Sequence, residues 1–277
     1  MSDSPSGEPI AEPFDRRARR RARDRAAKSY ADADFLRAAM LDDLIVRATG
    51  LERRWHRVLD LGAFDGASAG SLPGAEIVRV DAGFTFARDQ SGFGVQADED
   101  RVPFLDSSFD LILSAGALDG VNDLPGALVQ CRRLLTPGGV FLASFVGGAS
   151  FAALRQALIE AEIEASGGAN ARLHPMVDAQ EAPGLLQRAG FSDPVVEIDR
   201  RSVTYGEVPR MISDLRAMGA GNILTARARQ PMTKKMAGVL FGALETLRGS
   251  DGRISVDFEI LTLTGRVPSN QRVEDAE

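Results

Sequence analysis

A buried apolar run that ends in a glycine-rich turn is the most informative chemical feature of this sequence. Residues Val58–Leu61 lead into Gly62-Ala63-Phe64-Asp65-Gly66. A turn of this kind places backbone N–H groups at the start of a following helix, where they meet the polar groups of a nucleotide cofactor. We therefore expect a cofactor loop here, shaped by Asp60, Gly62 and Gly66.

The spacing of this turn distinguishes two classes of cofactor loop. Dinucleotide-binding loops have the spacing G-x-G-x-x-G, whereas class I methyltransferases commonly show an acidic residue, one apolar residue and then G-x-G-x-G. The segment from Asp60 to Gly66 follows the second pattern at every position except Phe64, where a glycine is expected. S-adenosylmethionine is the predicted cofactor. We expect Phe64 to weaken its binding, because a side chain here narrows the approach of its amino-acid end or changes the loop conformation.

Further carboxylates follow the next two predicted strands. Asp81 closes one apolar run, and Asp98 and Glu99 follow the next. Because the carboxyl ends of parallel strands meet at one edge of a sheet, we expect Asp81 to hold the cofactor ribose, Asp98 and Glu99 to meet the adenine, and Ser114 to line the floor. The alternative is structural: an aspartate at a strand end caps the next helix, and a glycine relieves a tight turn.

No catalytic residue is assigned, because methyl transfer depends mainly on positioning and needs no strong general base. Asp119 and Asn122 are the candidates for steering a substrate. The Asp119 carboxylate is suited to accepting a proton or pairing with a guanidinium; the alternative is an exposed loop aspartate. No metal is predicted, since His56 and His174 are the only histidines and Cys131 is the only cysteine.

Composition excludes several classes of protein. The net charge of −6 over 277 residues argues against general nucleic-acid binding, which requires a basic surface. No segment approaches the roughly 18 apolar residues of a membrane-spanning helix. A single cysteine rules out an intrachain disulfide and suits a reducing cytoplasm, so a cytoplasmic location is predicted.

Short apolar runs alternate with segments long enough for crossover helices, which is typical of a parallel sheet with helices on both faces. We predict an α/β fold: a doubly wound, mostly parallel, seven-stranded Rossmann-like sheet with an antiparallel edge strand. Strands are expected over 57–61, 76–80, 109–114, 139–146, 194–205 and 254–260. Helices are expected over 32–49, closed by Gly50 as the C-cap, and over 122–135, 149–165, 179–189, 207–218 and 233–247.

Three regions are predicted along the chain. Residues 1–30 form a basic N-terminal arm, residues 31–267 form the domain, and residues 268–277 form a disordered tail. A helical insert near 207–250 is expected to cover the substrate side. The basic block at 16–28 is interpreted as a solvated helix, with a contact surface for an acidic partner or a membrane rim as the alternative.

Several stretches carry a more specific resemblance. They are Phe14-Asp15-Arg16, Ala97-Asp98-Glu99-Asp100 with Pro103-Phe104, Val121-Asn122-Asp123-Leu124-Pro125, Pro137-Gly138-Gly139, Phe145-Val146-Gly147-Gly148, Arg188-Ala189-Gly190-Phe191 and Asp214-Leu215-Arg216-Ala217-Met218-Gly219. On these the sequence resembles the class I S-adenosylmethionine-dependent methyltransferase superfamily. Within it, the sequence is similar to the branch of the respiratory complex I assembly factor, an arginine hydroxylase, and the malonyl-carrier-protein methyltransferases.

The resemblance implies a methyltransferase-like protein that acts on or assembles a complex I subunit, with a protein substrate and a peripheral membrane contact. Two departures are Phe64, in place of glycine, and Asp119-Gly120, where the family has a His-Trp pair. They favour an alternative, a non-catalytic assembly factor with a degenerate cofactor loop. Protein arginine hydroxylation is a further alternative that rests on the resemblance alone, because no set of two histidines and a carboxylate is visible. A nicotinamide dehydrogenase is disfavoured by the loop spacing.

Overall fold

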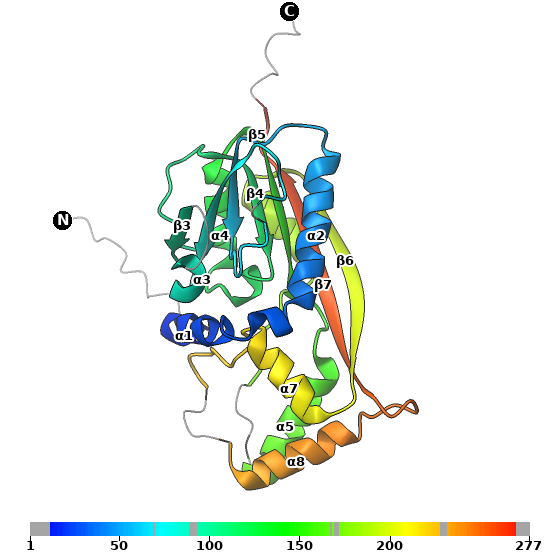
Figure 1. The fold of residues 1–277 in the computed structure, drawn as a ribbon. Coiled ribbons are helices and arrows are strands. Elements are labelled where there is room, and N and C mark those ends of the chain that lie inside the picture. Colours follow the sequence, from blue (N-terminus) through cyan, green and yellow to red (C-terminus); the bar gives the residue numbers. More distant parts are fainter. Residues whose placement is uncertain are drawn as a thin grey trace, which may run out of the picture.

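The computed structural model describes residues 12–68, 70–88, 93–166, 168, 172–227 and 232–269. Within them a seven-stranded sheet in the order β3-β2-β1-β4-β5-β7-β6 lies between helices (Figure 1). The strands are β1 (Arg57–Leu61), β2 (Glu76–Asp81), β3 (Phe93–Gln96), β4 (Phe109–Ala115), β5 (Leu135–Gly147), β6 (Ser192–Tyr205) and β7 (Ile254–Arg266). The helices are α1 (Arg16–Ala26), α2 (Phe35–Gly50), α3 (Phe84–Arg88), α4 (Leu124–Leu134), α5 (Ala152–Ser166), α6 (Ala182–Arg188), α7 (Val208–Ala217) and α8 (Lys234–Glu245), with 3₁₀ turns at Tyr30–Asp32 and Leu118–Gly120.

The predicted fold class is confirmed. Strands β1 to β5 pair in parallel, and β7 runs antiparallel between β5 and β6, so antiparallel pairing is confined to one edge. The chain order reverses on either side of β1, which is bonded to both β2 and β4. A reversal of this kind is where doubly wound sheets bind their ligands.

Most element ends differ from the prediction by a few residues, and β7 continues to Arg266, beyond the predicted end at 260. The strand predicted over 139–146 already begins at Leu135, because Leu135 pairs with Phe109 across a register shift. Gly50 is the last residue of α2, and Leu51 takes the C-cap position in its place.

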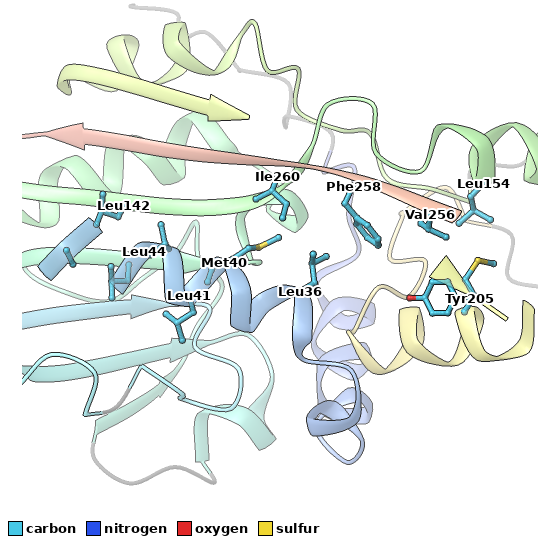
Figure 2. Close-up of a cluster of buried hydrophobic side chains, with 14 of the residues drawn as sticks. Leu36, Met40, Leu41, Leu44, Leu142, Leu154, Tyr205, Val256, Phe258 and Ile260 are labelled. Carbon is cyan, nitrogen blue, oxygen red and sulfur yellow. The ribbon is translucent and has the colours of Figure 1, made fainter. Parts of the chain in front are cut away.

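Alternation along the strands divides the core between the two faces of the sheet. In β4, Leu111 and Leu113 belong to one buried cluster and Ile112 to the other. The first cluster contains the apolar stripe of α2, and Figure 2 shows Leu36, Met40 and Leu44 of this helix directed at the sheet. On the other face α4 and α6 cover the second cluster. Helices therefore cover both faces of the sheet.

The interpretation of residues 16–28 as a solvated helix is wrong for half of the helix surface. Arg19 and Arg23 of α1 are only 7% and 5% exposed. The outer face of the segment is exposed, as expected; it carries Arg17, Arg21, Arg25 and Lys28. The physical reason lies outside the helix, because carboxylates that follow β2 and β3 face its inner side and pair with its arginines.

Residues 1–11 of the predicted arm and 270–277 of the predicted disordered tail lie outside the described residues. In the part of the chain that the structure describes, no helix has both the length and the apolar character that crossing a membrane requires.

Replacing Leu44 by alanine tests the packing of α2. Leu44 is fully buried, so Leu44→Ala is expected to lower the free energy of unfolding by about 2–5 kcal/mol. Val46→Ala is the control, because Val46 lies on the same helix but is 68% exposed. Urea unfolding measures both variants, and equal losses would contradict the assigned face of α2.

Candidate functional site

The glycine-rich turn after β1 is tightly packed against the segment that follows β4. Gly62 has a φ of +80° and Gly66 a φ of +70°, which glycine adopts without steric cost. The N–H groups of Gly62 and Ala63 both donate to the carbonyl of Val80, at 2.8 and 2.9 Å. A Cβ atom on Gly62 would lie 2.1 Å from the Cβ of Ala117. Gly62 is therefore required by both its conformation and its neighbour.

Phe64 occupies the tip of this turn in a strained conformation. Its φ of +48° lies in the left-handed region, which costs about 1–3 kcal/mol for a residue with a Cβ. Its ring is buried and stacks on Tyr30, with centroids 5.0 Å apart, and meets the edge of Phe86 at 5.6 Å. The guanidinium carbon of Arg23 lies 3.6 Å from the Phe64 ring centroid. These contacts offset the backbone strain.

Asp81, the carboxylate predicted to hold the ribose, is fully buried and engaged by four donors. Its Oδ1 accepts from Nε of Arg23 at 2.8 Å and from the N–H of Gly83 at 2.7 Å. Its Oδ2 accepts from Nη2 of Arg23 and from the N–H of Phe64 at 3.0 Å. Burial alone would raise the pKa of Asp81, but the charge and hydrogen bonds of Arg23 outweigh it, so the pKa is lowered.

The acidic residues that follow β3 are paired with the same helix. Arg19 binds both oxygens of Glu99, and Arg20 binds Asp98 through Nη2 at 2.6 Å. Asp100, which the sequence prediction did not include, receives two hydrogen bonds from Arg16, at 2.6 and 2.7 Å. Helix α1 therefore lies across the carboxylates predicted to bind the adenosine, at the end of the sheet beside α3 (Figure 1).

Asp60 and Ser114 hold the strands under the turn. Asp60 is fully buried, and its Oδ2 accepts from the hydroxyl of Ser68 and lies 3.8 Å from Nη2 of Arg37. Its other oxygen, Oδ1, has no hydrogen-bond partner among the residues that the structure describes. Burial raises the pKa of Asp60, although Arg37 acts in the opposite direction. The Ser114 hydroxyl donates to the carbonyl of Leu61 at 2.7 Å, which ties β4 to β1.

A cavity of about 170 Å³ adjoins this turn, and Asp81 is not among its lining residues. Its lining is mostly apolar and includes Phe64, Met40, Leu215 and Met218. The charged and titratable side chains of the lining come from seven residues. They are Arg19, Arg23, Arg37, Asp119, Arg172 and His174, and the phenol of Tyr30 is the seventh titratable group.

The charges of the cavity are unequally compensated. The four lining arginines are each paired with a carboxylate, on Glu99, Asp81, Asp60 with Asp65, and Glu162 respectively. The side chain of Asp119 has no hydrogen bond or ion pair to another described residue. Burial raises its pKa to about 6, with Arg19 opposing the shift. Burial also lowers the pKa of His174, which leaves that ring neutral near pH 7.

The other substrate-steering candidate, Asn122, is used to anchor the start of α1. Its Oδ1 accepts from the N–H of Phe14 at 2.8 Å, and its Nδ2 donates to the carbonyl of Phe14 at 3.1 Å. Phe14 also bridges to Leu224 and packs beside Ile223. Asn122 is absent from the cavity lining, whereas Asp119 is part of it.

Sequence reasoning missed the arginines of α1 as members of the site. The available signal was spacing: Arg16, Arg19, Arg20 and Arg23 lie three, four and seven residues apart, which places them on one helix face. A run of three acidic residues at 98–100 offers the complementary charges. The periodicity alone did not show that the two sets meet.

Comparisons with known proteins agree with this architecture. A model described as a methyltransferase domain matches residues 59–143. The human arginine-hydroxylase NDUFAF5, a mitochondrial protein, is 30% identical over 84% of this chain and 70% of its own length. The malonyl-[acyl-carrier protein] O-methyltransferase of Halorhodospira halophila is 31% identical over 85% of this chain and 82% of its own length. The chain belongs to the class I methyltransferase superfamily.

Two further matches agree with this in sequence and in fold. The zebrafish NDUFAF5 is 34% identical over 66% of this chain, which spans only 57% of that protein. A putative methyltransferase from Bacillus halodurans has the same fold, with a TM-score of 0.57 and 15% identity over 82% of this chain and 100% of its own. The cofactor of this superfamily is S-adenosylmethionine.

In the described conformation, the carboxylates predicted to bind the adenosine end of that cofactor are already occupied. Both oxygens of Asp81 already accept two N–H donors each, and the residue is 0% exposed. Glu99 is likewise 0% exposed and bound to Arg19. A ribose or an adenine reaches these carboxylates only after the arginines of α1 leave them.

Alanine at Gly62 tests the close packing of the turn. Gly62→Ala is expected to lower the free energy of unfolding in two ways. The alanine is strained at a positive φ, and its methyl group overlaps Ala117, which adds about 1–3 kcal/mol to the loss. Gly70→Ala supplies the baseline for the strain alone, since Gly70 has a φ of +82° and open space around it. Thermal and urea unfolding compare the two variants, and equal losses would show that the segment after β4 does not restrict Gly62.

Proposed function

We propose that this chain is a methyltransferase-like protein whose substrate is another protein, and that it recognises an arginine side chain of that substrate. The observation that carries the proposal is the Asp119 carboxylate, which lines the cavity beside the turn after β1 and forms no ion pair with another of the described residues. A desolvated carboxylate gains most from a charge-assisted, bidentate hydrogen bond, and a guanidinium has the matching geometry. The apolar lining suits the methylene stem of the same side chain.

The size of the cavity supports a side chain over a whole metabolite. Its volume of about 170 Å³ is close to that of a cavity that accepts one benzene ring, at about 150 Å³. Drug-sized ligands occupy pockets of roughly 300–1,000 Å³. The family resemblance of the sequence indicates which protein carries the recognised arginine: we infer that the substrate protein is a subunit of respiratory complex I.

A second candidate is a non-catalytic assembly factor that binds its partner without cofactor chemistry. One specific observation favours it. Arg23 forms an ion pair with Asp81, and its guanidinium lies against the ring of the strained Phe64. Arginine hydroxylation is supported by the name of the NDUFAF5 relatives alone. A cytoplasmic location stays a prediction, since the single cysteine favours it while those relatives are named mitochondrial.

The arginine site is tested by calorimetry with a small probe. Nα-acetyl-arginine methylamide is expected to bind, whereas the citrulline analogue, which is neutral and nearly isosteric, is expected to bind far more weakly. Asp119→Asn should reduce arginine affinity by about 10- to 100-fold, the usual range for a hydrogen bond to a charged group. Equal binding of the two probes, or an unaffected Asp119→Asn variant, would contradict arginine recognition by Asp119.

The pH dependence of the same binding follows from the raised pKa of Asp119. Above pH 6 the carboxylate is ionised and attracts the guanidinium, and below pH 6 it takes up a proton and loses that attraction. At pH 5, about one unit below the pKa, roughly a tenth remains ionised, so affinity is expected to fall about tenfold from its value at pH 7.5. A flat profile in the wild type, or an equal decline in Asp119→Asn, would show that another group controls binding.

The reaction class is tested separately with tritiated S-adenosylmethionine and purified complex I subunits. Transfer of tritium to a subunit would support the methyltransferase over the assembly factor. A subunit that is captured by the protein but never labelled would support the assembly factor. Neither result depends on the small-probe experiment.

A further inference from the structure

The three aromatic residues around Arg23 form, with Asp81, a receptor for a guanidinium. Asp81 at the end of β2 binds the planar group edge-on through Nε and Nη2. Phe64 covers one face of it, with the guanidinium carbon 3.6 Å from the ring centroid, and Phe86 lies 5.7 Å away. Tyr30 packs against both rings at 5.0 and 5.3 Å. Carboxylate, ring face and burial together are the features that recognise arginine in preference to lysine.

We propose that the ribose end of the cofactor site in this chain is a guanidinium-binding site, occupied by Arg23 of its own helix α1, and that α1 and the adenosyl group compete for it. A guanidinium at this place accounts for a phenylalanine at position 64, where a glycine is expected. In a G-x-G-x-G loop the central glycine leaves room for the cofactor, whereas Phe64 directs a ring at the guanidinium and adopts a left-handed φ to do so. The residue that departs from the cofactor pattern is the one that binds Arg23.

The neighbouring pairs extend this contact along the helix. Arg19 with Glu99, Arg20 with Asp98 and Arg16 with Asp100 place one arginine on each of three successive carboxylates. Removing one partner of a buried pair leaves the other charge uncompensated, which is strongly unfavourable. Displacing helix α1 is therefore costly, and the cost is lower when another group donates to Asp81 and Glu99. An adenosyl group offers neutral hydroxyl and amino donors for them.

The anchoring of α1 at its first turn is consistent with a hinge there. Phe14 is held by Asn122 and Leu224, and Asp15 caps the helix through the N–H of Ala18 and accepts from Nη2 of Arg227 at 2.8 Å. These contacts lie at one end of α1 and Arg23 at the other. Release of the Arg23 end leaves the anchored end in place.

Chemical rescue tests the guanidinium site without the cofactor. Arg23→Ala is expected to lower the melting temperature, and millimolar ethylguanidinium should restore most of the loss by binding the folded state. Ethylammonium at the same concentration should restore little, because it lacks the planar fork. Arg21→Ala is the matched control, since Arg21 lies on the exposed face of α1, and neither compound should stabilise it. The proposed guanidinium site would be overturned if ethylguanidinium gave no rescue, if the two cations rescued equally, or if the two variants were stabilised equally.

Calorimetry with S-adenosylhomocysteine tests the competition. Arg23→Ala, or Arg23→Gln if the alanine variant does not fold, is expected to bind at least about tenfold more tightly than the wild type, because α1 no longer places a cation on Asp81. Ethylguanidinium should weaken that binding in the Arg23→Ala variant. If the wild type binds S-adenosylhomocysteine measurably and the variants bind it equally or more weakly, the competition is refuted.

The two experiments also separate this inference from the proposed function. The competition rests on S-adenosylmethionine binding by the chain, whereas the guanidinium site does not. Rescue by ethylguanidinium with no binding of S-adenosylhomocysteine to any variant would refute both the competition and the methyltransferase, and would leave the guanidinium site and the assembly factor supported. Rescue together with tighter binding by Arg23→Ala supports both proposals.

Discussion

The contact between α1 and the acidic ends of the central strands is the interaction on which the rest of the site depends. Four arginines on one helix face meet Asp81 and the run at 98–100. Taking such charges out of water is costly, and their attraction repays the cost only where the geometry is close and every lone pair is satisfied. At Asp81 this condition is met by two bonds from Arg23 and two from backbone N–H groups. The position of α1 is thereby fixed, and with it the wall of the cavity.

Phe64 links that contact to the cofactor turn. Its backbone N–H binds Asp81, its ring lies on Arg23, and its left-handed φ is the strain that the arrangement tolerates. The aromatic cluster with Tyr30 and Phe86 belongs to segments that are far apart in the sequence and meet only here. A substitution that looked like decay of a cofactor loop thus has a positive role in the folded chain. The same ring also lines the cavity that contains Asp119.

Much of the fold was predictable because its signals are local. The short apolar runs and the turn at 62–66 predicted a doubly wound, mostly parallel sheet. The apolar stripe of α2 predicted a helix that packs on this sheet. The contacts of α1 were not predictable in this way, since a basic helix is ordinarily solvated and only the tertiary arrangement shows which carboxylates it meets. Asn122 was identified as a polar residue near the site, but its bond to Phe14, 108 residues earlier in the chain, has no local signature. Asp119 was identified as a substrate-steering candidate at the position where the resembled family has a His-Trp pair. That it forms no ion pair with another described residue became visible only with the cavity around it.

The most direct measurement is hydrogen exchange of the amides of α1 in the wild type and in Asp81→Asn. If the carboxylate of Asp81 holds the Arg23 end of the helix, the variant loses the charge that neutralises a buried guanidinium, and the amides of α1 should exchange faster while those of α2 keep their rates. Equal exchange of α1 in both proteins would show that apolar packing alone holds the helix, and would contradict the account given for this site.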